Sequence, residues 1–436
     1  MLKAILYLGL TAVGLVGTLV NPFIGAVTCL EAYMMNPTAI PMPDGRFRYQ
    51  FWTTIALLVS CLLHRAKGVE RVNREGFPLK ALWVFVGIGA LSSFWAVNPQ
   101  LAWDSIYEVL KTVVLTSLLV RAIQNERQMR IVMLACIAGA THASILHTFG
   151  VRFGYIPASL GREAGLLPDS QTVVLVFFVP VILLIAMTGG KFERIFCWCA
   201  LPFVLNSIVT SYMRTGLVCL AVELALMLIL LKPGLTLRLV PVLAGGLILF
   251  IVRLTPENYW QWMSTIETPT QESSANSRFF IDRTSWRMFT DHPMGVGYRN
   301  YIELSPKYFP REYLDPANGK RSAHNSFFTI LCETGIFGFA AFMSAFGGAA
   351  WLLRRIRKAA DPTSPSRVAV YAIALEIGLY GWAVAGLFHS EHEVDPAYWA
   401  IAFAVILTRL HWQVSGSSQE GDDAAELSAA AHTTFP

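Results

Sequence analysis

Long apolar stretches recur from one end of this sequence to the other, and they constrain its fold more than any other feature. A membrane-spanning helix needs about 20 mostly apolar residues. Stretches of this kind are centred near positions 12, 28, 57, 87, 112, 140, 179, 204, 224, 246, 340, 379 and 404. They are continuously apolar and do not alternate, which favours helices over barrel strands. With 54% hydrophobic and 14% charged residues, the chain is too apolar for a soluble domain. We therefore predict an all-α polytopic membrane protein.

The basic residues indicate which ends of these spans share a side of the membrane. Lysine and arginine in short loops mark the cytoplasmic side. Five basic clusters are separated by pairs of spans, so all of them can lie inside together: Arg65/Lys67/Arg71/Arg74/Lys80, Arg121/Arg127/Arg130, Lys191/Arg194, Lys232/Arg238 and Arg354/Arg355/Arg357/Lys358. This alternation places residues 95–104, 150–170, 254–323 and 389–396 on the outer face and makes the C-terminus cytoplasmic.

The number of spans depends on how often residues 1–35 cross the membrane. If Lys3 is cytoplasmic, residues 1–35 cross once with a break at Asn21-Pro22, which gives twelve spans with both termini inside. Two crossings would give thirteen spans with the N-terminus outside; we favour twelve. No cleavage site follows the first stretch, so we expect a retained anchor. Residues 1–412 then form one transmembrane domain with 254–323 inserted, and 413–436, rich in small and acidic residues, form a disordered cytoplasmic tail.

Two groups of metal-ligand residue types are weak candidates. The seven cysteines lie in or beside apolar runs, which is typical of buried thiols and not of a disulfide framework. Cys197 and Cys199 are spaced as Cys-x-Cys inside a span. The last outer loop contains five residues of metal-ligand type close together: His389, Glu391, His392, Glu393 and Asp395. A hydrated loop explains this composition as well as a metal site does. We predict no metal site.

The outer segment 254–323 is too aromatic for a linker. Within SRFFIDRTSWRMF, aromatic positions Phe279, Trp286 and Phe289 and basic positions Arg283 and Arg287 recur at helical spacing. We predict a helix that lies on the outer surface as a lid.

Arginines on the outer face are contrary to the usual excess of Lys and Arg in cytoplasmic loops, so a functional role is considered for each of them. Arg214 lies in TSYMRTGLV, between two apolar runs. A charge at a helix centre in the membrane costs about 2.5 to 3.5 kcal/mol and often marks a functional site; the alternative is an arginine that reaches the interface.

Arg278, Arg283 and Arg287 could bind phosphate oxygens bidentately. The alternative for these three is a solvated helix face paired with the nearby acids Glu272, Asp282 and Asp291.

The junction RSAHNSFFTILCETGIFGF (321–339) joins this polar segment to an apolar helix. His324 stands before a helix capped by Asn325 or Ser326, with its N-terminus outward. Free N–H groups there attract anions and disfavour imidazolium, so a neutral ring could accept a proton; the alternative is an ordinary amphipathic residue at the interface. Gly335 and Gly338 would let helices approach closely. The two glycines of HPMGVGY indicate a tight turn.

These segments resemble a known family. His324-Asn325, nine residues, Gly335, two residues and Gly338 resemble the His-[Asn/Ser/Gln]-x9-Gly-x2-[Gly/Thr/Tyr] signature of bacterial O-antigen ligases, whose superfamily includes O-antigen polymerases and protein O-oligosaccharyltransferases. DHPMGVGYRNY is similar to the superfamily's His-Pro-x-Gly-x-Gly element. TSYMRTG resembles its Ser-Arg-Gly-like segment, with Met213 where serine is common. The strong resemblance covers about residues 205–340, and NPFIGAVTCLEAYMMNP is similar to the start of a subgroup described as O-glycosylation ligases.

The resemblance implies a GT-C type glycosyltransferase of the bacterial inner membrane, with twelve helices, a large periplasmic loop and a reaction without metal or other cofactor. It implies an undecaprenyl-pyrophosphate-linked glycan as donor and a hydroxyl of lipid A-core as acceptor, with membrane lipids around it and no role for nucleic acid. We expect His324 to be catalytic and Arg214 and Arg278 to bind the pyrophosphate. Supporting roles fall to Asn325, Arg283, Arg287 and Arg321.

Three alternatives stay open. The acceptor could be the end of a growing O-antigen, or a serine or threonine of a protein. From a different class, the chain could be a lipid or glycan transporter. The charge is concentrated at one face and not along a central path through the spans, which disfavours transport.

Overall fold

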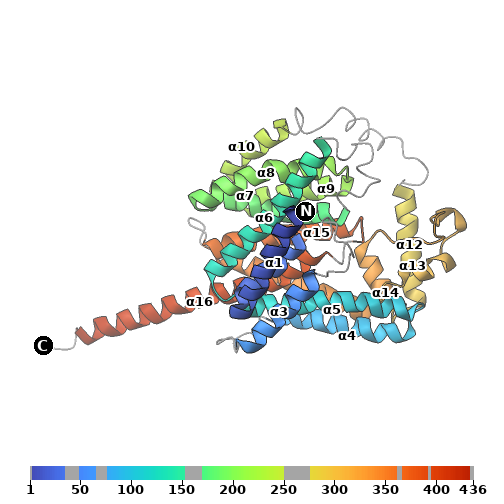
Figure 1. Ribbon diagram of the computed structural model, residues 1–436, viewed down its shortest axis with the longest axis horizontal. Helices are drawn as coiled ribbons and strands as arrows, with labels where there is room; N and C mark the ends of the chain where they lie inside the picture. Colours follow the sequence, from blue (N-terminus) through green and yellow to red (C-terminus); the bar gives the residue numbers. More distant parts are fainter. Residues whose placement is uncertain are drawn as a thin grey trace.

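The computed structural model describes residues 2–34, 49–64, 76–152, 169–249, 275–360, 366–390 and 394–432, and these residues form helices and connecting turns without any strand (Figure 1). The first half holds α1 (Leu2–Val20), α2 (Pro22–Met34), α3 (Tyr49–Leu63), α4 (Phe77–Ser92), η3 (Ser93–Trp95), α5 (Pro99–Ala122), α6 (Glu126–Arg152), α7 (Asp169–Thr188) and α8 (Lys191–Thr210). The second half holds α9 (Arg214–Leu230), α10 (Pro233–Leu249), α12 (Ala275–Asp291), α13 (Tyr301–Leu304), η6 (Ser305–Lys307), η7 (Arg311–Tyr313), α14 (Ser326–Ala359), α15 (Arg367–Gly386) and α16 (Asp395–His432).

Each apolar stretch that the sequence predicts is centred on one of these helices. Six helices in the described ranges are long and apolar enough to cross a membrane: Phe77–Trp95, Glu126–Phe149, Ser170–Thr188, Lys191–Thr210, Ser326–Ala359 and Arg367–Gly386. Shorter apolar helices precede them near the N-terminus. An all-helical membrane protein with several spans is thereby supported, whereas the total of twelve spans stays a prediction.

The N-terminal segment differs from the expected single crossing. The chain reverses direction at Asn21. A side chain at Gly14 would meet Thr28, and a side chain at Gly17 would meet Ile24. These pairs are the contacts of two antiparallel helices, so α1 and α2 form a helical hairpin. The break at Asn21 is therefore the turn of a hairpin and not a kink in one span.

The basic residues near the starts of α6, α8 and α10 and at the end of α14 lie at one end of the bundle, whereas Arg65, Lys67, Arg71 and Arg74 of the first cluster lie outside the described residues. Arg130 Nε contacts Glu193 Oε1 at 2.5 Å, which links the start of α6 to the start of α8. Lys232 Nζ donates to the carbonyl oxygen of Ala360 at 2.8 Å, which links the start of α10 to the end of α14. The opposite end carries α12 and α13, at the right of Figure 1.

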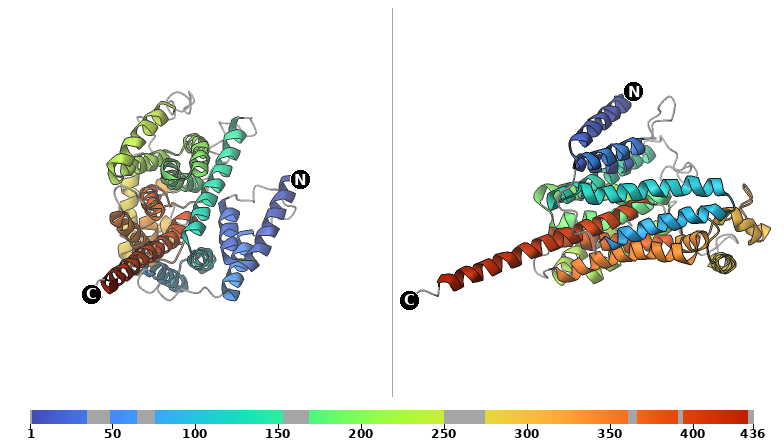
Figure 2. Two further views of the ribbon diagram at one scale, coloured as in Figure 1. Left: turned by 90° about the vertical axis from the view of Figure 1, so that its left-hand side faces the viewer. Right: turned by 90° about the horizontal axis from the view of Figure 1, so that it is seen from below.

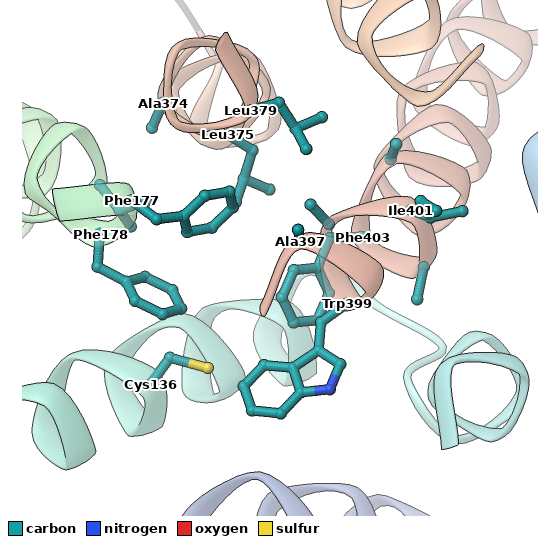
Figure 3. Packing of buried hydrophobic residues seen from close by; sticks show 14 of the residues in the cluster. Cys136, Phe177, Phe178, Ala374, Leu375, Leu379, Ala397, Trp399, Ile401 and Phe403 are labelled. Carbon is teal, nitrogen blue, oxygen red and sulfur yellow. The ribbon is translucent and has the colours of Figure 1, made fainter. Parts of the chain in front are cut away.

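The largest core lies between α6, α7, α15 and α16. Phe177 and Phe178 from α7, Cys136 from α6 and Trp399 from α16 are almost completely buried there (Figure 3). Gly378 lets α15 approach α7 closely, because a Cβ atom at this position would lie 2.6 Å from the carbonyl oxygen of Phe177. This core fixes the helices whose outer ends build the site.

Helix α16 runs to His432 and projects beyond the bundle (Figure 2). Helical backbone is thus assigned to the tail up to residue 432, and the disordered cytoplasmic tail stays a prediction.

Candidate functional site

The N-terminus of α14 is capped as the sequence predicts, and Asn325 is the cap. Its Oδ1 accepts hydrogen bonds from the backbone N–H groups of Phe327 at 3.0 Å and Phe328 at 3.2 Å. These two donors belong to the free N–H groups that every helix start leaves. His324, just before the cap, is exposed and has a left-handed backbone with φ of 47°, which few non-glycine residues adopt.

Ten residues after Asn325, α14 is broken at Gly335, whose φ of 67° and ψ of −172° are not helical. The segment 292–297 fills the break. The backbone N–H of Val296 donates to the carbonyl of Cys332 at 2.9 Å, and that of Ile336 donates to the carbonyl of Pro293 at 3.1 Å. The HPMGVG loop therefore satisfies the backbone groups that the kink releases.

The glycines of both motifs make this docking possible. Gly295 and Gly297 have φ of 86° and 97°, which confirms the tight turn. A Cβ atom on Gly335 would collide with the backbone of the loop, so this glycine admits a loop and not the neighbouring helix that the sequence suggests. Gly338 does pack against a helix, since a Cβ atom there would lie 3.3 Å from Ile88 of α4. The two motifs form one structural unit.

The loop is also anchored to η3 and α5. Trp95 Nε1 donates to the carbonyl of Gly295 at 3.0 Å, and the backbone N–H of Asn98 donates to Asn300 Oδ1 at 2.5 Å. Asn98 is itself the N-cap of α5. Two separate parts of the chain, residues 95–98 and the break in α14, therefore hold the loop in place.

Helix α12 confirms the helix predicted in the outer segment. Its buried face joins a small hydrophobic cluster separate from the main core: Ile281, Met288, Val296, Tyr301, Leu304, Phe309, Ala323 and Cys332. The other face exposes Phe279 by 72% and Trp286 by 54%, with Arg283 and Arg287 beside them. Arg283 and Arg287 thus lie on the solvent side of α12, and a lid role for this helix stays a prediction.

The structure brings Arg278 and His324 to the same place, the end of α15. The Arg278 guanidinium carbon lies 5.3 Å from the ring centre of Phe388. The His324 ring lies 6.4 Å from the ring of His389, nearly perpendicular to it. Ser326 Oγ donates to the carbonyl of His389 at 2.8 Å and ties this segment to the first turn of α14. Neighbouring residues of one short segment therefore contact the proposed cation and the proposed proton acceptor.

Arg214 begins α9, directly after a tight turn in which Tyr212 has φ of 55°. Farther along, Glu223 of α9 packs against Gly381 of α15. A Cβ atom on Gly216, two residues after Arg214, would lie 2.8 Å from Thr172 at the start of α7, whereas Thr188 at the end of α7 lines a pocket with Arg367 at the start of α15. Helix α15 is therefore antiparallel to α7 and α9, and Arg214 lies toward the same end of the bundle as the end of α15.

Arg321 has a different position from the other supporting candidates. Its backbone N–H donates to Ser305 Oγ at 2.8 Å, and its side chain is half-buried. The backbone of Arg321 is thus tied to the segment that contributes Tyr301 and Leu304 to the small hydrophobic cluster. Burial, the largest effect, raises the pKa of the Tyr301 hydroxyl well above its usual value.

The acidic loop after α15 is described only in part, because residues 391–393 lie outside the described ranges. Asp395 Oδ1 accepts a hydrogen bond from Thr112 Oγ1 at 2.6 Å. Among the described residues, no group of three His, Cys, Asp or Glu side chains could hold a metal ion. Cys197 is buried and Cys199 exposed, on different sides of α8.

Two features of the site cannot be predicted from the sequence. The first is the role of Phe388 and His389, which depends on the packing of α15 beside α14. The second is backbone strain: in the described part of the chain, the non-glycine residues with positive φ are Tyr212, Arg299 and His324. Each lies in one of the three motif segments, and such strained residues, which cost about 1–3 kcal/mol each, cluster at functional sites.

The fold and the site define a helical membrane protein in which a capped helix, a docked loop and an arginine-bearing helix meet at one end of the bundle. Residues 195–343 match the family model described as O-antigen ligase, which places this stretch in the O-antigen ligase family. The match confirms the resemblance carried by the three motifs, and it includes Arg214, Arg278 and His324. Members of the family are glycosyltransferase-like enzymes, ligases or polymerases. A comparison with curated proteins gives no match.

Proposed function

We propose that this chain is an O-antigen ligase, which transfers a glycan from an undecaprenyl-pyrophosphate donor to a hydroxyl of lipid A-core at the periplasmic face of the inner membrane. One observation carries the proposal: Arg278 and His324 contact Phe388 and His389, two adjacent residues. A permanent cation and a group able to accept a proton are thus held together at one end of the bundle. The family match over residues 195–343 supplies the reaction class.

In this proposal the arginines act on the leaving group. Arg214 and Arg278 bind the pyrophosphate and stabilise the negative charge that develops as the bond between the anomeric carbon and the phosphate oxygen breaks. The guanidinium group suits this task because it remains charged at any physiological pH and matches phosphate oxygens bidentately. The electron pair of the broken bond leaves with undecaprenyl pyrophosphate.

His324 acts on the acceptor. Its ring orients the acceptor hydroxyl and takes its proton while the hydroxyl oxygen forms a bond to the anomeric carbon from the face opposite the leaving group. The configuration at that carbon is therefore inverted. The Asn325 cap next to His324 and the strained backbone of His324 itself support a fixed orientation of the ring.

The lipid part of the donor needs an apolar surface beside this site. The apolar faces of the spans supply it, and the exposed aromatic residues Phe279 and Trp286 of α12 extend it outside the bundle. Aromatic side chains are common at the boundary between lipid and water. The polyprenyl chain would lie along this surface with its pyrophosphate directed to Arg278.

Acceptor identity is the test that separates ligase from polymerase and from protein glycosylation, since all three share donor and leaving group. Deletion of the gene from its host should leave lipid-linked polymer accumulated and unattached. Persistence of single repeat units would identify a polymerase instead. With the purified protein, transfer to lipid A-core but not to free glycan or to a serine-containing peptide is expected. Movement of donor across liposomes without any new glycosidic bond would contradict the enzyme assignment.

A further inference from the structure

A polar cluster joins the last turns of α6 and α8, two helices that are long and apolar enough to cross a membrane. Six side chains form it: Ser144, His147 and Thr148 of α6 and Asn206, Ser207 and Thr210 of α8. Asn206 Nδ2 donates to Thr148 Oγ1 at 2.9 Å, and Ser207 Oγ donates to the carbonyl of Ser144 at 3.2 Å. Polar groups inside membrane spans are costly and often mark functional sites, yet the chemistry described above gives this cluster no part.

His147 makes the contact of this cluster that lies nearest to Arg214 along the chain. Its Nε2 atom and Thr210 Oγ1 are 2.9 Å apart, and Thr210 Oγ1 donates its hydrogen to the carbonyl of Asn206 at 2.7 Å. A hydroxyl group has one hydrogen, so the ring donates the bond between His147 and Thr210. Among the described residues, the buried Nδ1 atom of the ring has no hydrogen-bond partner. A second proton at Nδ1 would be a buried donor without an acceptor, so His147 acts as a neutral donor.

The contacts between α6 and α8 fix the register of the two helices. Arg130 and Glu193, at one end of the pair, are 63 positions apart in the chain, and so are His147 and Thr210 at the other end. Because the offset is the same at both ends, the helices run parallel and in step. His147 therefore fastens the last turn of α8 to a fixed level of α6.

The last turn of α8 carries the tight turn that precedes Arg214. The backbone N–H of Ser211 donates to the carbonyl of Ser207 at 3.0 Å, and the backbone N–H of Met213 donates to Ser211 Oγ at 3.3 Å. Between them, Tyr212 has φ of 55°. A left-handed backbone at a residue other than glycine persists only where its surroundings hold it in place. The anchored end of α8 supplies that hold.

We propose that His147 is a positioning residue that holds the turn before Arg214, so that the guanidinium group of Arg214 meets the pyrophosphate. The inference rests on the proposed function and adds a residue to its machinery. His147 does not touch the reacting atoms: it acts through Thr210 and the turn on the leaving-group side, whereas His324 acts on the acceptor.

The test uses the full-length protein in detergent or nanodiscs, with kcat and KM measured for transfer from the purified donor. His147→Leu removes the donor and should lower kcat/KM about 10- to 100-fold, since a displacement of about 1 Å can cost about 10²-fold. His147→Gln keeps an N–H donor but no ring nitrogen that could take a proton, and it should recover most of the rate. His142→Leu replaces an exposed histidine of the same helix; it is the matched control and should behave as wild type.

A double-mutant cycle tests the route through Arg214. In an Arg214→Ala background, His147→Leu should cause little further loss of kcat/KM, because the group that His147 positions has been removed. A general loss of stability would instead multiply the two effects. Independent losses in the cycle, wild-type kcat and KM in His147→Leu, or no recovery in His147→Gln would each overturn the positioning role.

Hydrogen exchange of residues 207–213 gives a readout that does not need activity. Faster exchange is expected in His147→Leu than in His147→Gln or His142→Leu, and equal exchange in all three would also overturn the inference. If the wild-type protein transfers no glycan at all, the proposed function fails, whereas the exchange comparison still decides whether His147 orders the turn before Arg214.

Discussion

His324 stands one residue before the cap of α14, exposed and held in a left-handed conformation. His324→Ala should abolish transfer while leaving protein level and melting temperature intact, since general-base catalysis contributes about 10²- to 10⁴-fold and the ring has little buried surface to lose. Transfer from purified donor to lipid A-core measures the effect. His64→Ala, an exposed histidine at the end of α3, is the control. Full activity in His324→Ala would remove this residue from the mechanism.

Arg278 offers a graded test of the leaving-group side. Arg278→Ala should lower kcat by about 10²- to 10³-fold, as loss of one group that stabilises developing charge does. Arg278→Lys should recover part of the rate, because it keeps the charge but not the bidentate geometry. Arg311→Ala removes an exposed arginine of the same outer segment and should have no effect. Equal activity in all three variants would contradict a role for Arg278.

At the scale of single elements, the break in α14 makes a prediction about stability. Gly335→Ala should destabilise the packing between α14 and the HPMGVG loop, because φ of 67° with ψ of −172° suits only glycine and the new Cβ would lie 2.5 Å from Pro293 and Met294 atoms. A cost of about 1–3 kcal/mol for the backbone alone is expected. It should appear as a lower melting temperature and faster proteolysis of the outer segment.

Gly347→Ala is the matched control for that change. Gly347 lies in the same helix, and a Cβ atom there meets nothing within 4 Å. Replacement of a helical glycine by alanine stabilises a helix by about 1 kcal/mol, so this variant should melt at the same temperature or higher. A fall in melting temperature of equal size in both variants would show that the kink is not the cause.

The sequence predicts elements well here and their contacts poorly. Apolar stretches locate the helices, and a helix cap at Asn325 or Ser326 follows from residue type and position, because both signals are local. The hairpin at Asn21 is not predictable in this way, since the same Asn-Pro pair suits a kinked span and a tight turn. Gly335 and Gly338 share one spacing pattern, yet the first admits a loop and the second packs on α4. The packing partner of each residue depends on which distant segment of the chain lies beside it in the fold. The sequence around each residue does not contain that information.

The site itself shows the same division. His324, Arg214 and Arg278 can be selected from the sequence through the resemblance of their segments to the family, since residue chemistry alone leaves an ordinary alternative for each. Phe388 cannot, because an ordinary phenylalanine acquires its role only from the packing that brings Arg278 over its ring.

At the scale of the whole molecule, the proposed chemistry predicts transfer without a divalent metal. Arginine side chains supply the positive charge that a metal ion provides in other glycosyltransferases. Purified protein treated with EDTA should therefore transfer glycan at the untreated rate. A metal-dependent glycosyltransferase assayed with the same chelator is the control. Strict dependence on metal would redirect attention to the acidic loop from Glu391 to Asp395.

The docking of residues 292–297 into the break of α14 restricts how such proteins can exchange parts. A hybrid that takes the loop from one relative and the kinked helix from another would join two surfaces that were never selected together. Crossover points between residues 298 and 332 should therefore give poorly expressed chimeras, whereas exchanges that move 292–338 as one block should be tolerated. New acceptor preferences would then arise most easily by variation outside this block.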